Sequence, residues 1–156
     1  MAGKSSLLVA AAGSLAIALL HLAIWMSGSP AWYAWFGARG LGELAARGSI
    51  VPTLFTLPIA ALFAVFGAYA LSAAGFIRRL PLLKTVLVLL ALIYTLRGLV
   101  LILDLFALVT VLNYPPRAAV FSGVSLSIGL AYSIGTIRAW PRLRKTPIQP
   151  SHEAGI

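Results

Sequence analysis

Four stretches of the chain are each long and apolar enough to cross a lipid bilayer as a single helix. They comprise residues 6–26, 51–74, 83–112 and 118–137. The hydrocarbon core of a bilayer is about 30 Å thick, and a helix needs about 20 residues to span it. The sequence therefore predicts an all-α fold, an integral membrane four-helix bundle that forms one domain over residues 1–140.

The composition agrees with a membrane protein. Hydrophobic residues make up 61% of the chain and charged residues 10%, whereas soluble domains are about 45–50% apolar and about 25% charged. The chain has no cysteine, which excludes disulfides, thiolate metal sites and cysteine nucleophiles. The formal net charge of +9 does not indicate nucleic-acid binding, because no compact basic domain carries it.

The first apolar stretch has two interpretations. Lys4 and the small residues 27–29 resemble the ends of a cleavable signal peptide. However, the apolar run over residues 7–24 is longer than the usual 7–15 residues of such a peptide. The preferred interpretation is a retained membrane span.

The charges between the spans predict the orientation. Cations are concentrated on the cytoplasmic side of inner-membrane proteins. One side carries Arg39, Arg47, Arg117 and the acidic Glu43. The other side carries Lys4, Arg78, Arg79, Lys84, Arg138, Arg142, Arg144 and Lys145. We therefore expect a multi-pass protein of the bacterial inner (plasma) membrane with both termini in the cytoplasm.

Two segments outside the spans have their own patterns. Arg39, Glu43 and Arg47 follow one another at i, i+4 and i+8 beside Trp32 and Trp35. This spacing predicts a short helix with ion pairs, lying at the outer interface between spans one and two. Residues 141–156 are basic, contain prolines and lack periodicity, which predicts a disordered cytoplasmic tail near anionic headgroups.

The fourth span carries two rows of small residues on roughly opposite faces. Small residues let membrane helices approach closely. This span can therefore pack on two neighbours, either both within the chain or one in a second copy or another membrane protein. The rows are Gly123-Ser127-Ala131-Gly135 and Ser125-Gly129-Ser133.

The third span carries an arginine and an aspartate in its apolar interior. Arg97 and Asp104 are seven residues apart, so a helix places them on one face about 10 Å apart along its axis, with Tyr94 within about 60° of that face. Charges at this depth usually face the bundle interior and mark a pathway or a binding site. The alternative is a structural ion pair, because the Asp104 side chain leans toward Arg97.

His21 is the other polar residue at similar depth. It lies five residues inside Met26, about 7 Å from the outer end of span one. His21 would meet Asp104 if spans one and three packed together; otherwise it is a hydrogen-bonded packing residue. The candidate ligand-binding residues are therefore Arg97, Asp104, Tyr94 and His21.

The chemistry of an enzyme is largely missing. The spans contain one carboxylate and one histidine, with Glu43 outside them. A hydrolase or transferase would need paired carboxylates, a nucleophile with its base, or clustered metal ligands. We therefore predict no catalytic residues, no metal and no cofactor.

Two short motifs carry a family resemblance. The sequences HLAIW (residues 21–25) and LIYTLRG (residues 92–98), the latter in the third of four spans, resemble small uncharacterised bacterial four-span membrane proteins. The resemblance implies the four-span layout and no particular activity. The leading hypothesis is a protein that binds or conducts a small anionic or amphipathic ligand. The alternatives are a non-catalytic subunit of a membrane complex and, third, an integral-membrane enzyme.

Overall fold

The fold is all-helical in the part of the chain that a computed structural model describes, residues 3–144. Four helical segments are long and apolar enough to cross a membrane, so the predicted number of spans and the all-α fold are confirmed. The helices are α1 (Lys4–Ser27), α2 (Pro30–Trp35), α3 (Arg39–Ala46), α4 (Val51–Ala74), α5 (Leu83–Leu99), α6 (Leu101–Thr110) and α7 (Arg117–Arg144).

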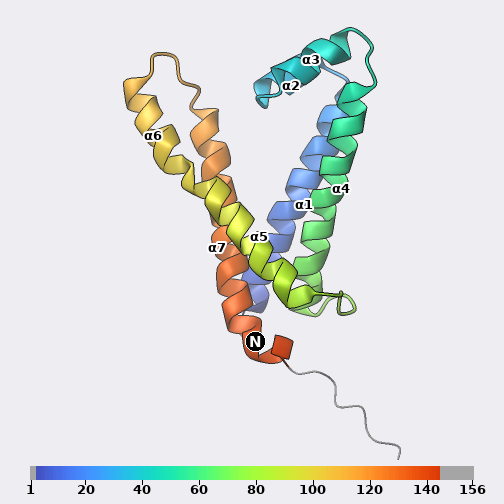
Figure 1. The fold of residues 1–156 in the computed structure, drawn as a ribbon, viewed down its shortest axis with the longest axis vertical. Coiled ribbons are helices and arrows are strands. Elements are labelled where there is room, and N and C mark those ends of the chain that lie inside the picture. The colour runs from blue at the N-terminus through green and yellow to red at the C-terminus, as the bar shows by residue number, and fades with distance from the viewer. Residues whose placement is uncertain (1–2, 145–156) are drawn as a thin grey trace, which may run out of the picture.

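The spans form two pairs that meet at one end of the molecule. Helix α1 packs along α4, and α5 with α6 packs along α7, while α1 also contacts α7. The pairs lie close together near the end where α1 begins and α7 ends, here called the terminal end (Figure 1). They diverge toward the opposite end, where α2 and α3 lie, here called the loop end. The bundle is therefore V-shaped.

A chain of hydroxyl groups joins all four spans. Tyr132 of α7 donates a hydrogen bond of 2.8 Å to the carbonyl of Phe66 in α4. The hydroxyl of Ser14 in α1 lies 3.1 Å from that of Tyr132 and 3.0 Å from that of Tyr94 in α5. The Tyr132 hydroxyl has one proton and donates it to the Phe66 carbonyl. Ser14 must therefore donate to Tyr132, and Tyr94 must donate to Ser14. We call Ser14, Tyr94 and Tyr132 the hydroxyl chain.

Both small-residue rows of α7 are used within this chain. A Cβ atom added at Gly135 would lie 2.8 Å from the Leu7 side chain of α1, and one at Gly129 would lie 2.6 Å from the backbone nitrogen of Thr95 in α5. Small side chains thus allow α7 to approach α1 and α5 at the same time. The first half of the first row is open, since nothing lies within 4 Å of a Cβ at Gly123 and Ser127 is exposed.

The third predicted span is one candidate span, Leu83–Thr110, divided into two helices. Val100 lies between α5 and α6 with φ −57° and ψ −20°, values typical of a local 3₁₀ turn. The helical hydrogen bonds resume at once, because the Asp104 amide donates to the Val100 carbonyl at 2.9 Å. This bend contains no proline and lies between Arg97 and Asp104.

The segment between α1 and α4 contains two short helices instead of one. Arg39 begins α3, but Arg47 is already its C-cap. No ion pair links Arg39, Glu43 and Arg47 within residues 3–144, so this part of the prediction is wrong. Arg47 lies at the C-cap, outside the regular helix, whereas Arg39 and Glu43 both lie within α3 and still form no ion pair.

The predicted tail falls largely outside the described residues. Helix α7 continues through Pro141 to Arg144, so the first four residues of the predicted tail are helical. Residues 145–156 are not described.

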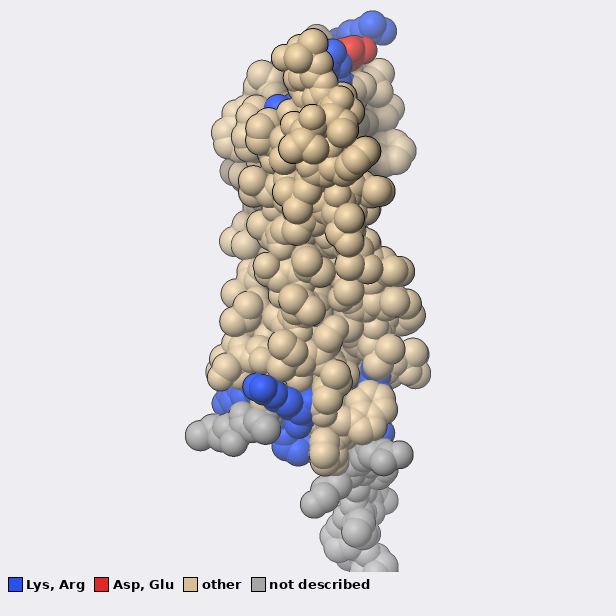
Figure 2. Space-filling model, turned by 90° about the vertical axis from the view of Figure 1, so that its left-hand side faces the viewer, with Lys and Arg blue, Asp and Glu red and all other residues tan. Residues whose placement is uncertain are grey.

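Charged side chains gather at the two ends of the face on the α6–α7 side (Figure 2). Lys and Arg atoms form a band at the terminal end, and Lys, Arg and acidic atoms mark the loop end. Between them this face is uninterrupted by charge, as expected of a surface in contact with hydrocarbon.

Candidate polar site

The carboxylate of Asp104 is the centre of a polar cluster between α6 and α7. Only 5% of this residue is exposed. Ser122 of α7 donates to Asp104 Oδ2 at 2.5 Å. Tyr114, in the connection before α7, donates to Oδ1 at 2.5 Å. Both carboxylate oxygens therefore accept a hydrogen bond from a hydroxyl group, which stabilises a buried negative charge.

Arg97 reaches this cluster through Ser122. Its Nη1 donates to Ser122 Oγ at 2.8 Å, so the one hydroxyl accepts from the arginine and donates to the aspartate. Arg97 and Asp104 form no direct ion pair within residues 3–144. The axial separation that the sequence predicts is thus bridged by a serine hydroxyl from a neighbouring helix.

The guanidinium of Arg97 is only partly satisfied. A guanidinium has five N–H donors, and Ser122 is its one hydrogen-bond partner within the described residues. Arg97 is exposed, whereas its partner Ser122 is fully buried. The cluster thus combines the Asp104 carboxylate, whose two oxygens both accept hydrogen bonds, with the Arg97 guanidinium, which retains N–H donors without a partner in the described residues.

Tyr114 lies outside the spans, and the cluster changes the pKa of its hydroxyl. The hydrogen bond to the Asp104 carboxylate raises the pKa of Tyr114, because loss of the phenol proton would remove the donor and place two negative charges together. Tyr114 therefore remains a neutral donor across the physiological pH range.

Tyr94 is a predicted site residue, but it does not bond to the charged cluster. Only 4% of it is exposed, and its hydroxyl belongs to the hydroxyl chain through Ser14. Its ring stacks on Tyr132 with centroids 5.6 Å apart. Tyr94 is one helical turn before Arg97, so it fixes the face of α5 on which Arg97 lies.

His21 is also separate from Asp104. Its Nδ1 lies 2.8 Å from the Ile17 carbonyl of its own helix, and its ring lies 5.4 Å from that of Phe63 in α4. Helices α1 and α6 do not contact each other within residues 3–144. A line of rings nevertheless runs from His21 to Phe63 and on to Tyr94, 6.3 Å from Phe63.

Two members of the cluster, Ser122 and Tyr114, are missing from the sequence-based site. Ser122 lies outside both small-residue rows of α7, and serines are frequent in this helix. Tyr114 resembles an ordinary interfacial aromatic residue. Ser122 differs from the other serines of α7 only in its position opposite the α5–α6 bend.

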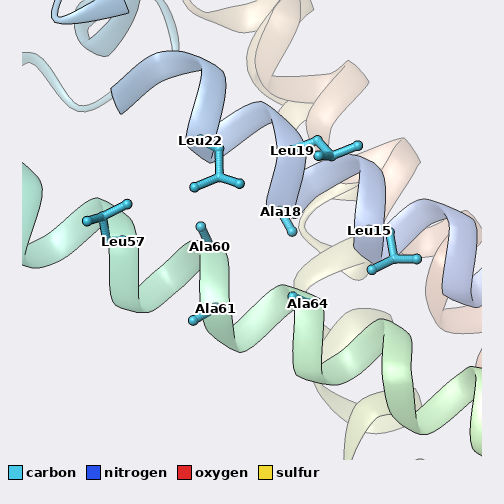
Figure 3. A pocket seen from close by; sticks show the side chains of 8 residues that line it. All are labelled: Leu15, Ala18, Leu19, Leu22, Leu57, Ala60, Ala61 and Ala64. Carbon is cyan, nitrogen blue, oxygen red and sulfur yellow. The ribbon is translucent and has the colours of Figure 1, made fainter. Parts of the chain in front are cut away.

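A second feature, a groove between α1 and α4, offers no polar group (Figure 3). Its volume is about 460 Å³. The groove exists because alanines of both helices leave room between leucines. It is lined by Leu15, Ala18, Leu19, Leu22, Leu57, Ala60, Ala61 and Ala64. These side chains can only contact hydrocarbon, so the groove lacks the convergent polar groups of a specific site.

Comparisons with known proteins find no match for this chain. No protein-family model, no curated protein and no solved structure matches it. The described residues contain no group of three His, Asp or Glu side chains that could hold a metal ion. The fold and its site define a small protein with four apolar, membrane-length helices and one polar cluster among them.

Proposed function

We propose that this protein binds an anionic or amphipathic ligand within the membrane, with Arg97 as the anion anchor. Asp104, held by Ser122 and Tyr114, fixes the position of Ser122 and balances the charge of Arg97. Tyr94, one turn before Arg97, and His21 both lie against the ring of Phe63. Conduction of the ligand across the membrane is compatible with this arrangement and is not required by it.

One observation supports the proposal above all: an exposed arginine in the middle of an apolar span with one bonded donor. A charge at this depth is costly unless a partner compensates it. Asp104 supplies the opposite charge, but its oxygens are engaged by Ser122 and Tyr114. An oxyanion on the remaining N–H groups would satisfy Arg97 in the bidentate geometry that guanidinium favours.

The alternative of an assembly subunit has weaker support. It depended on the two rows of α7, and these are largely occupied by α1 and α5. An enzyme has less support still, because the polar cluster holds one carboxylate and neither a histidine nor a second acid.

The proposed setting is the bacterial inner membrane with both termini in the cytoplasm. The cations near the terminal end support this orientation. We expect reporter fusions after Arg79 and at the C-terminus to report cytoplasm and a fusion after Gly48 to report the outside. A cytoplasmic signal after Gly48 would contradict the orientation, and a mature chain beginning near Ser29 would show that α1 is a cleaved signal.

The binding proposal is tested with radiolabelled dodecyl phosphate and the protein in lipid nanodiscs. The matched variant is Arg97→Gln combined with Asp104→Asn, which keeps polar groups at both positions and the same net charge. A charge-assisted hydrogen-bonding pair contributes about 1.5–3 kcal/mol, so we expect about 10–100-fold weaker binding by the variant. Dodecyltrimethylammonium should not compete. Equal affinity of the two proteins would contradict the proposal.

A further inference from the structure

The terminal end carries positive charge that no carboxylate of the described residues balances. Within residues 3–144 the acidic residues are Glu43, which lies in α3 at the loop end, and Asp104, which is bonded in the polar cluster. Figure 2 shows Lys and Arg atoms as a band at the terminal end. The described part of this end is therefore strongly basic. Its cations include Lys4, Arg78, Lys84 and Arg138.

Contacts between three segments bring these cations to one place. The Nζ atom of Lys4 lies 4.5 Å from the ring centroid of Phe76, in the connection of residues 75–82 between α4 and α5. A Cβ atom added at Gly3 would lie 3.0 Å from the Cβ atom of Arg138, so the start of α1 also lies against α7. The cation–π contact leaves the positive charge of Lys4 in place. The start of α1, the α4–α5 connection and the last part of α7 thus meet at the terminal end.

The α4–α5 connection is fixed by polar side chains of α4. Ser72 Oγ donates to the Arg78 carbonyl and accepts from the Leu80 amide, both at 3.0 Å. Tyr69 donates to the Pro81 carbonyl at 3.2 Å. Tyr69 and Ser72 are three residues apart and so lie on the same side of the helix. The backbone at Arg78 is therefore held in position by α4 itself.

The same connection exposes large apolar side chains beside its cations. Phe76, Ile77 and Leu82 expose 56%, 42% and 75% of their surface. Leu82 also has a φ of 52°, a left-handed conformation that is unfavourable for a residue with a Cβ atom. A strained leucine whose side chain is mostly exposed contributes little to packing within the described residues. The connection is thus a surface of alternating cationic and apolar side chains.

Lipid headgroups lie where this surface lies. Helix α4 ends at Ala74 and α5 begins at Leu83, and both belong to segments long and apolar enough to span a membrane. A short connection between two spans lies at the boundary between hydrocarbon and headgroups. Cations at this boundary attract anionic lipids, and apolar side chains there contact the first part of the acyl chains. An anionic phospholipid matches both properties of the surface.

We propose that the α4–α5 connection binds the headgroup of an anionic phospholipid. The phosphodiester group lies against the exposed Arg78 and the half-buried Lys84, and Leu82 contacts the acyl chains. A zwitterionic phospholipid carries the same phosphate, but its ammonium group cancels the charge, so it binds more weakly. The proposal does not involve Arg97 and is therefore independent of the ligand proposed above.

The first test compares phosphatidylglycerol with phosphatidylcholine, each spin-labelled on an acyl chain, around the full chain in phosphatidylcholine vesicles. Electron paramagnetic resonance measures the fraction of each label that the protein immobilises. We expect phosphatidylglycerol to associate about fivefold more strongly, and Arg78→Gln combined with Lys84→Gln to remove most of this preference. Equal association of the two lipids with the native chain would overturn the proposal.

Arg39→Gln combined with Arg47→Gln is the matched control. It removes two exposed arginines from the loop end, so the net charge changes equally, and the preference should remain. Equal loss of preference in both double variants would show that the preference follows net charge, and the proposal would fail. Soluble glycerol phosphate, which has the headgroup phosphate without acyl chains, should not release the lipid when added in large excess. Release would show that the surface binds soluble phosphates instead.

Leu82→Gly tests the apolar part of the surface. Glycine adopts a positive φ without strain, which offsets its greater freedom in the unfolded chain, so the melting temperature in detergent should change little. Phosphatidylglycerol should nevertheless associate about threefold more weakly, because a partial apolar contact is lost. Leu112→Gly, which removes a leucine that is 90% exposed near the loop end, should leave the association unchanged. Unchanged association in Leu82→Gly would overturn the role of Leu82, whatever the melting temperature.

Discussion

Replacing Gly98 with alanine is expected to separate α5 from α7 and to destabilise the protein more than any other single methyl addition. A Cβ atom there would lie 2.4 Å from both the backbone nitrogen and the Cα of Leu126. Backbone atoms cannot rotate away as a side chain can, so one helix must move. Overpacking costs about 1–3 kcal/mol in well-packed cores, and we expect a loss near the upper limit. Thermal unfolding in detergent measures it.

Gly123→Ala is the matched control in the facing helix. It adds the same methyl group to α7, where nothing lies within 4 Å, so stability should change by less than about 0.5 kcal/mol. If Gly98→Ala were as stable as Gly123→Ala, the close packing of α5 on α7 would be wrong.

Removing either charge of the polar cluster alone is expected to destabilise the protein, and removing both is expected to restore much of the loss. Arg97→Leu leaves the buried Asp104 carboxylate without a nearby cation. Asp104→Leu leaves an intramembrane arginine and removes the acceptor of Ser122 and Tyr114. An apolar replacement of both charges often restores stability, because no uncompensated charge remains. Melting temperatures of the two single variants and the double variant measure this coupling.

The exposure of the two residues predicts an asymmetry. Asp104 is buried and Arg97 is exposed, so Arg97→Leu should be the more harmful of the single changes to folding. The double variant should be folded but unable to bind dodecyl phosphate. A double variant that still binds would remove Arg97 and Asp104 from the site, and purely additive losses would show that the charges are not coupled.

Ser122 provides an independent check on the bridge. Ser122→Ala removes the hydroxyl between the two charges, whereas Ser125→Ala removes one whose single partner within residues 3–144 is the Phe121 carbonyl of its own helix. The first change should lower the melting temperature and the second should have little effect. Similar melting temperatures would show that the bridging hydroxyl is dispensable.

Much of the fold follows from hydropathy, because length and apolarity alone define a membrane span. The sequence-based bounds 51–74 coincide with α4, and those of spans one and three differ by at most two residues at each end, whereas α7 continues seven residues beyond the predicted end of span four, to Arg144. The bend at Val100 was not predictable, since it involves neither proline nor a run of glycines. It arises where Gly98 and Leu126 bring α5 into close contact with α7.

The polar cluster was only half predictable. Helical periodicity places Arg97 and Asp104 on one face, but it cannot identify the group between them. Ser122 comes from another span, and its position depends on how α7 is rotated against α5. The same limitation applies to His21, which could be paired with Asp104 only by assuming that spans one and three pack together. In the structure α1 packs on α4 and α7, and His21 lies against Phe63 instead.

The central claim, that Arg97 holds an oxyanion, is tested most directly by measuring the magnetic dipolar coupling between ligand and guanidinium. Protein with ¹⁵N-labelled arginine would be reconstituted in lipid that lacks phosphorus, and dodecyl phosphate would supply the only ³¹P nucleus. Solid-state NMR should then show dephasing of one guanidinium signal by ³¹P, and that signal should be missing in the Arg97→Lys variant. Bound dodecyl phosphate without dephasing of the Arg97 signal would contradict the account.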